Sequence, residues 1–343
     1  MYLQHFGLEK SPFSLTPDPR FLFLTPRHRE ALAALLFAVT ERKGFMVMTG
    51  DAGTGKTTLV RKLLLSIPST CAQFSVIVNP ALNRSEFLEC LLMDFGVENV
   101  PASKALRLAL LKKFLLRAHS EGRTSVLVID EAHLLTAELT DEIRLLSNFE
   151  TSEQKLLQII LAGQNELNAV LNLESMRQVK QRVAIRMHID PLPAPEVKRY
   201  LQTRWARASA RQPLPFSDDA IELAAQCSGG IPRVINVICD AALVNAYGSG
   251  LVSIGPKQIQ EVINDLQLSA PVWAKKPEIS VGPELPAVPV ASTVSRPEIP
   301  KLEHPNLAGT GLKSLERYIP EKSKTPRLFR IASWFGTTQT VTK

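Results

Sequence analysis

The sequence predicts an α/β domain built on a parallel sheet, followed by a small all-α domain and a Pro-rich tail. Up to residue 189, short apolar runs typical of buried strands alternate with segments of helical apolar spacing. From residue 194 to 268 only the helical spacing continues, and ten of the 24 prolines then fall in 270–343. We therefore expect a linker over 1–25, an α/β domain over 26–192, a helical domain over 193–268, and a mostly disordered basic tail over 269–343.

Each element has its own signal. Thr25 as N-cap and Pro26 at the first helical position predict a helix that ends near Arg42. We expect strands at 45–49, 72–78, 125–129, 156–162 and 184–189, with helices at 56–66, 85–95, 104–119, 138–149 and 164–181. Four further helices are expected at 194–209, 217–227, 232–247 and 256–268. The Pro- and Phe-rich residues 1–25 are expected to be extended.

The first chemical motif follows the strand expected at 45–49. Residues 50–57 fit the pattern G-x-x-x-x-G-K-[ST], and strand, Gly-rich loop and helix follow one another as a phosphate-binding P-loop requires. Inward-facing backbone N–H groups and the helix N-terminus would cradle nucleotide phosphates. Lys56 would contact the β- and γ-phosphates, and the Thr57 hydroxyl would ligate Mg²⁺. We assign the cradle to Gly50, Asp51, Ala52, Gly53, Thr54, Gly55, Lys56, Thr57 and Thr58.

The second motif ends another apolar run, 125–129, with the carboxylates Asp130 and Glu131. A parallel strand delivers such residues to the same sheet edge as the P-loop. Asp130 is then expected to bind Mg²⁺ and Glu131 to polarise the attacking water. Paired acids are also typical of a helix N-terminus, because Glu131 precedes the apolar residues Ala132–Leu135. The P-loop upstream favours the catalytic interpretation.

Composition limits the other classes of protein. No run of 18 apolar residues predicts a membrane span, and the N-terminus lacks the features of a signal peptide. Four cysteines without a C-x-x-C pair are expected to be buried thiols. These features indicate the cytoplasm. From residue 270 onward, eleven Lys and Arg face six Glu, so this part carries +5 of the formal +7. The high pI is therefore no sign of nucleic-acid binding by the folded core.

A P-loop domain followed by four helices resembles the AAA+ ATPases. Strings near the N-terminus, such as Phe6-Gly7-Leu8 and 17–24, resemble the opening of the ExeA/GspA group of secretion-associated ATPases, as do 28–32, 161–164, 181–182 and 229–233. This resemblance covers about residues 1–268. It implies an ATP-hydrolysing enzyme that uses Mg²⁺ and forms a homo-oligomer. The long members continue into a transmembrane helix and a peptidoglycan-binding module, whereas here a Pro-rich tail follows.

The resemblance also implies roles for single residues. Gln164 resembles the polar sensor-1 residue near the γ-phosphate, with a helix cap as the alternative. Arg233 resembles sensor 2, with an ordinary surface arginine as the alternative. Arg182 resembles an arginine finger offered to a neighbouring subunit, and Arg177 and Arg186 are its rivals. The segment around Pro12 and Phe13 is expected to pack on the adenine, although core packing fits Phe13 equally well.

Three functions follow from this reading. The first is an AAA+ motor or switch that assembles or regulates an envelope secretion or exopolysaccharide-export machine. Its tail, through the basic and aromatic residues 327–335, would bind a partner protein, with weak contact to the inner-membrane surface. The second is a DNA-associated ATPase of the transposition-helper or origin-recognition type, ranked lower because no DNA-binding module follows the helical domain. The third is a nucleotide-dependent scaffold without turnover.

Overall fold

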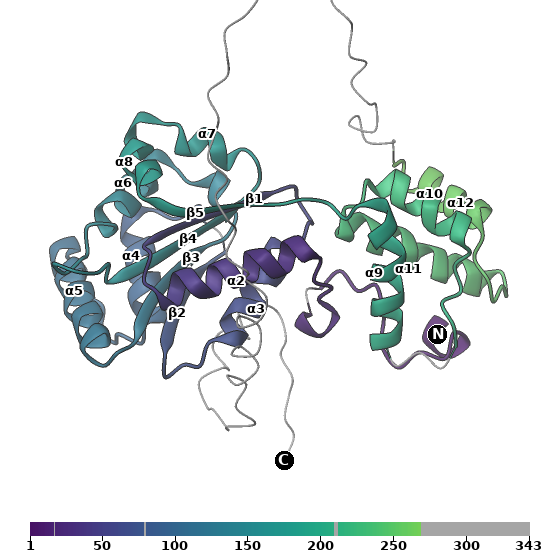
Figure 1. The fold of residues 1–343 in the computed structure, drawn as a ribbon, viewed down its shortest axis with the longest axis horizontal. Coiled ribbons are helices and arrows are strands. Elements are labelled where there is room, and N and C mark those ends of the chain that lie inside the picture. The colour runs from purple at the N-terminus through teal and green to yellow at the C-terminus, as the bar shows by residue number, and fades with distance from the viewer. Residues whose placement is uncertain (17, 79, 209–211, 269–343) are drawn as a thin grey trace, which may run out of the picture. The chain divides into compact units, whose positions relative to one another are not determined.

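The computed structural model describes residues 1–16, 18–78, 80–208 and 212–268 (Figure 1). The predicted tail and its 327–335 segment lie outside these residues. Within them, no helix is both long enough and apolar enough to cross a bilayer. The following description therefore concerns the sheet region, the helical region and the N-terminal segment.

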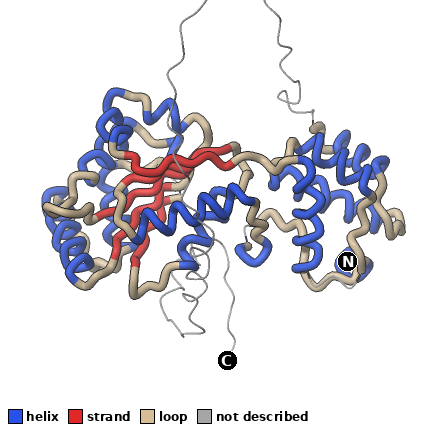
Figure 2. Tube along the Cα trace, viewed as in Figure 1, coloured by secondary structure: helices blue, strands red, loops and turns tan. Residues whose placement is uncertain are grey.

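Five parallel strands form one sheet, as the alternating pattern predicts (Figure 2). Their order in the sheet is β2-β3-β4-β1-β5. The strand β4 separates the P-loop strand β1 from β3, which ends in the two carboxylates, so one additional strand lies between the two strands that carry the motifs. The strands are β1 Phe45–Gly50, β2 Ala72–Ile77, β3 Thr124–Ile129, β4 Leu157–Gly163 and β5 Val183–Ile189.

Helices cover both faces of this sheet, which explains why its central strands are buried at every position and mostly apolar. Successive side chains of a strand point to opposite faces. Val47 belongs to the hydrophobic core on one face of the sheet, and the buried residue Met46 points to the other face. On that face α2 (Pro26–Thr40) and α3 (Lys56–Ser66) contact the sheet. The core on Val47's side is formed with α4 (Arg84–Asp94), α5 (Lys104–Ser120) and α6 (Ala137–Leu146).

The prediction of one continuous helix over 164–181 is wrong. The segment 164–181 forms three short pieces, namely α7 Leu167–Leu171, the 3₁₀ helix η3 Glu174–Met176 and α8 Arg177–Gln181. The chain is extended at Leu173, with φ −59° and ψ 146°. The Asn172 side chain accepts a hydrogen bond from Lys180 Nζ at 2.7 Å, so this polar residue stabilises a turn between the pieces. Leu171, Met176 and Val179 all remain buried, which explains why the spacing resembled one helix.

The helical region contains the four expected helices, with bounds that differ by a few residues at most. They are α9 Ala194–Arg207, α10 Asp218–Ser228, α11 Pro232–Gly248 and α12 Pro256–Asp265. Ser217 caps α10 by accepting a hydrogen bond from the Ala220 N–H, and Gly229 ends it in the left-handed conformation.

The N-terminal segment is not simply extended. It contains α1 (Tyr2–His5) and the 3₁₀ helix η1 (Pro19–Phe21), and its aromatic residues belong to the core of the helical region. Phe13 is fully buried, and its ring lies edge-on to that of Phe216 with centroids 6.1 Å apart. Of the two uses expected for Phe13, the structure therefore has core packing. Hydrogen bonds from Arg204 to the Pro12 and Ser14 carbonyl oxygens, at 2.6 and 3.3 Å, fix the segment on α9.

Candidate functional site

The Gly-rich loop joins the carboxyl end of β1 to the first turn of α3. At Gly53 the backbone has φ +83°, a left-handed conformation that favours glycine. A Cβ atom there would lie 2.6 Å from the Cβ of Arg233, and one on Gly50 would lie 2.4 Å from the Ile189 carbonyl oxygen. Both positions therefore exclude a side chain, and the loop keeps the open backbone that a phosphate cradle needs.

Lys56 is the first residue of α3, directly after this loop, and is buried. Its ammonium donates hydrogen bonds to the carbonyl oxygens of Gly50 at 2.8 Å and Asp51 at 2.9 Å. Burial lowers its pKa from the ordinary value, although the carboxylates Glu131 and Asp130 oppose that shift. The structure thus holds a cationic side chain against the Gly-rich loop at the start of a helix, where an anionic phosphate fits.

Thr57 and Asp130 meet at the same sheet edge. The Thr57 hydroxyl donates to Asp130 Oδ2 at 2.7 Å, and the Glu131 N–H donates to Asp130 Oδ1 at 3.0 Å. Asp130 is only 3% exposed. A hydroxyl and a carboxylate oxygen beside a phosphate cradle are the hard oxygen donors that Mg²⁺ prefers, so the donor set fits this cation.

Glu131 adopts the left-handed conformation, with φ 51° and ψ 35°, at the start of the 3₁₀ helix η2 (Ala132–Leu134). Glu131 thus stands at a helix N-terminus, as the alternative interpretation expected, but its side chain makes no capping hydrogen bond and is 42% exposed. The carboxylate lies 3.5 Å from His133 Nδ1, and its charge acts to raise the pKa of Lys56 in the P-loop.

Gln164 follows β4 and contacts the same histidine. Its side-chain Nε2 lies 3.1 Å from His133 Nε2, and its backbone N–H donates to His133 Nδ1 at 3.4 Å. The next residue, Asn165, donates from its amide to Asp51 Oδ1 at 2.7 Å. The end of β4 therefore contacts both the Asp-Glu turn and the P-loop. Sequence reasoning missed His133 and Asn165. The available signal was that His133 and Asn165 lie within four residues of the carboxyl ends of β3 and β4.

Arg182 is not brought to this edge. It precedes β5, whose first residue lies opposite Phe45, while Gly50 lies opposite Ile189. Five residues of strand, about 17 Å at 3.3 Å each, separate the two ends. The guanidinium donates to Asn148 Oδ1 at 2.9 Å and Ser147 Oγ at 3.2 Å. Arg182 therefore does not contact the P-loop of its own chain. Arg177 and Arg186 are likewise exposed on this part of the molecule.

Arg233 meets the P-loop through its backbone. Its N–H donates to the Gly53 carbonyl oxygen at 3.3 Å, while its side chain is exposed. Of the remaining assigned loop residues, Ala52 is exposed, Thr58 is half-buried, and Thr54 is buried with its hydroxyl donating to the Asp51 carbonyl oxygen at 2.9 Å.

A further residue that sequence reasoning assigned no role is His28, in the first turn of α2. Its Nε2 lies 3.2 Å from the Thr54 carbonyl oxygen, and its Nδ1 lies 2.7 Å from the Thr25 hydroxyl. Burial lowers the pKa of this imidazole below its ordinary value. A buried and neutral imidazole thus ties the start of α2 to the back of the P-loop.

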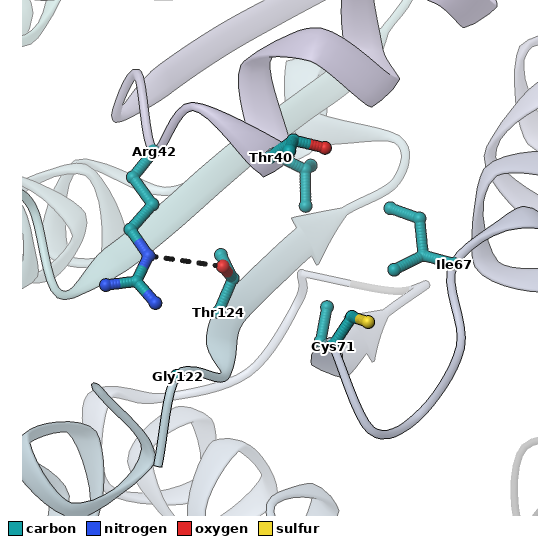
Figure 3. A pocket seen from close by; sticks show the side chains of 8 residues that line it. Thr40, Arg42, Ile67, Cys71, Gly122 and Thr124 are labelled. Carbon is teal, nitrogen blue, oxygen red and sulfur yellow. Dashed lines mark hydrogen bonds between the residues drawn. The ribbon is translucent and has the colours of Figure 1, made fainter. Parts of the chain in front are cut away.

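A shallow pocket lies at the opposite edge of the sheet, where β2 and β3 begin (Figure 3). Arg42 Nε donates to the Thr124 hydroxyl there at 3.3 Å, and Cys71 lines the same pocket. None of the assigned nucleotide residues lines it.

Of the four cysteines, Cys71 is exposed and only Cys239 is buried, which corrects the expectation of four buried thiols. Among the described residues, no cluster of three His, Cys, Asp or Glu could hold a metal ion.

Residues 39–171 match the model of an AAA domain. General secretion pathway protein A of Aeromonas hydrophila is 40% identical over 251 residues, which are 73% of this chain and 46% of that protein. The chain thus spans about half the length of that relative.

Solved structures extend the likeness to the fold alone. CDC6P from Pyrobaculum aerophilum matches with a TM-score of 0.60 at 19% identity, over 74% of this chain and 70% of that one. The Aeropyrum pernix ORC2 protein, in its ADPNP-ADP complexes, matches with a TM-score of 0.56 at 15% identity, over 74% and 72%. The sequence match to the Aeromonas protein, read with the AAA domain and this sheet order, identifies the chain as a homologue of general secretion pathway protein A with an AAA+ fold.

Proposed function

We propose that this chain hydrolyses ATP with the help of Mg²⁺. The observation that carries the proposal is the meeting of three groups at one sheet edge. Lys56 is held inside the P-loop, Thr57 and Asp130 form an oxygen pair, and Glu131 stands beside them with a partly exposed carboxylate. Such a set binds phosphates, holds a divalent cation and orients water, which are the tasks of phosphoryl transfer to water.

Each residue has a separate task in this proposal. Lys56 and the loop N–H groups bind the β- and γ-phosphates, and Thr57 and Asp130 hold Mg²⁺. The cation, when bound, neutralises charge on the phosphate oxygens. Glu131 accepts the proton of the attacking water as general base. Gln164 and Arg233, which both lie beside the loop, contact the γ-phosphate.

The position of Arg182 is an argument for an assembly of several copies of this chain. It lies at the sheet edge opposite its own P-loop, so it can reach a nucleotide only in a neighbouring subunit. An arginine finger supplied in this way contributes roughly 10³–10⁵ in rate. We infer a homo-oligomer in which each Arg182 completes the site of the next copy.

The proposed cellular role is based on the similarity to the Aeromonas protein. Because the Aeromonas protein is named for the general secretion pathway, we propose that this chain is an ATP-driven switch or motor for an envelope secretion or export machine. The tail would bind the partner protein at the cytoplasmic face of the inner membrane. The likeness to origin-recognition proteins shows the fold alone, so it does not favour the DNA-associated alternative.

Two variants test the enzyme proposal. Lys56→Ala is expected to lose most ATP binding, because the charge facing the phosphates is gone. Glu131→Gln is expected to bind ATP normally and to lose about 10²–10⁴ in turnover, the usual contribution of a general base. Lys113→Ala, on the exposed face of α5, is the matched control and should behave as wild type. Wild-type turnover by Glu131→Gln would show that Glu131 is not the base.

A further inference from the structure

His133 joins the ends of two strands that deliver site residues. It lies in η2, directly after the turn of Asp130 and Glu131, and its side chain is only 11% exposed. Its two ring nitrogens face different groups. Nδ1 lies 3.5 Å from the Glu131 carboxylate and 3.4 Å from the Gln164 backbone nitrogen, and Nε2 lies 3.1 Å from the Gln164 side-chain nitrogen.

The backbone around this histidine is closely packed. A Cβ atom on Gly163, the last residue of β4, would lie 3.0 Å from the His133 backbone nitrogen and 3.4 Å from that of Ala132. The absence of a side chain at Gly163 thus lets η2 approach the end of β4. The ring of His133 is therefore held in place by the strand end that also carries Gln164.

Nδ1 can serve only one of its two neighbours at a time. With the proton on Nδ1, the ring donates toward Glu131, and Nε2 accepts one N–H of the Gln164 amide. With the proton on Nε2, Nδ1 accepts the Gln164 backbone N–H and the ring no longer holds Glu131. The Gln164 amide has two N–H groups, so it can donate one to Nε2 and still offer the other to a phosphate oxygen.

We propose that His133 is a positioning residue that couples Gln164 to the orientation of the Glu131 carboxylate. When the Gln164 amide donates to both Nε2 and the terminal phosphate, the ring keeps its proton on Nδ1 and holds Glu131 toward the water. When Gln164 is not engaged, the other tautomer releases Glu131. This coupling rests on the proposed ATP hydrolysis, which it makes dependent on correct phosphate contact.

Kinetics of three variants test the coupling. His133→Ala is expected to lower kcat roughly tenfold or more, a part of the general-base contribution, with ATP affinity within about twofold of wild type. His133→Asn should recover part of that loss, because its amide places a donor near the former Nδ1. The His133→Ala, Gln164→Ala double variant should be no slower than the slower single variant, since both changes break one chain of contacts.

Several outcomes would overturn the proposal. They are multiplied losses in the double variant, no recovery by His133→Asn, or a loss of ATP affinity equal to the loss of kcat. His119→Ala, whose ring contacts Arg42 at the opposite sheet edge, is the matched control and should leave kcat unchanged. Thermal unfolding of every variant checks that the fold is kept.

A measurement without turnover separates this proposal from the enzyme proposal. The ring nitrogens of His133 can be followed by NMR in ¹⁵N-histidine-labelled full-length protein, assigned by comparison with His133→Asn. Gln164→Ala should shift both ring-nitrogen signals of His133, because one donor to Nε2 is lost. Unchanged signals would refute the coupling. A wild-type chain that binds ATP without hydrolysing it would refute the enzyme proposal while this NMR test still decides the contact.

Discussion

The sheet region and the helical region place their important residues in different ways. In the sheet region, β1, β3 and β4 each end in a short polar motif, and these three ends meet at one edge. In the helical region, contacts join residues more than 200 positions apart, such as the rings of Phe13 and Phe216 or the hydrogen-bonded side chains of Tyr2 and Asp240. The first region holds the candidate site in its local motifs, whereas the second is held together by contacts between distant parts of the chain.

The largest expected effect tests whether the chemistry of the sheet region is complete in one copy. Arg182→Ala should lower turnover by roughly 10³–10⁵, because the neighbouring site loses its finger. ATP binding and the melting temperature should stay close to wild type. Steady-state ATPase assays over a range of protein concentrations measure this, and wild-type specific activity should rise with concentration.

Mixing two inactive variants sharpens the same test. Arg182→Ala subunits keep Glu131, and Glu131→Gln subunits keep Arg182, so a mixture should regain some active sites. Arg177→Ala and Arg186→Ala serve as controls, since either would behave like Arg182→Ala if it were the finger. No rescue in the mixture, with activity strictly proportional to concentration, would leave Arg182 as a structural residue bonded to Asn148.

A core change in the helical region should act on stability and not on chemistry. Phe13→Ala removes a fully buried ring and is expected to lower the free energy of unfolding by about 3–5 kcal/mol. Phe37→Ala, in α2 and 54% exposed, is the matched control with a much smaller expected effect. Denaturant unfolding measures both. If the folded Phe13→Ala protein lost ATP affinity selectively, the adenine would be the partner of Phe13 after all.

His28 links α2 to the P-loop and predicts a smaller, pH-dependent effect. Burial lowers its pKa in the folded protein below the ordinary 6.5, so below that pH the unfolded chain binds more protons. The stability contribution is therefore present above about pH 6.5 and is lost as the pH falls toward the lowered folded value. Glu196 opposes the shift without reversing it. Melting temperatures between pH 5 and 8 should show a shallower acid slope for His28→Asn than for wild type, and equal slopes would contradict this assignment.

The smallest expected effect on the enzyme is that of removing the tail. A chain that ends at Leu268 keeps every residue of the site, so turnover and melting temperature should match those of the full chain. Its location in the cell should change, because we propose that residues 270–343 bind the partner. Trp334→Ala in the full chain is a narrower version of the same test. Identical fractionation of all three forms would refute the tether.

The P-loop and the Asp-Glu pair could be predicted because their geometry is local. A strand end, a glycine with positive φ and a helix start follow one another within about ten residues, so the sequence order alone sets their positions. The same holds for the strands of the central sheet, whose apolar runs report burial on both faces. These signals were sufficient for the fold class and for the expectation that Lys56, Thr57 and Asp130 lie together.

Only the tertiary structure decided where distant segments meet. The packing of Phe13 against Phe216, the break at Leu173 and the contact of His133 with Gln164 depend on which residues a folded core brings within a few ångströms. The apolar spacing of 164–181 reports burial but not the turn at Asn172. Likewise, the hydrogen bonds of Arg182 to Ser147 and Asn148 join segments about 35 residues apart, which only the folded structure brings together.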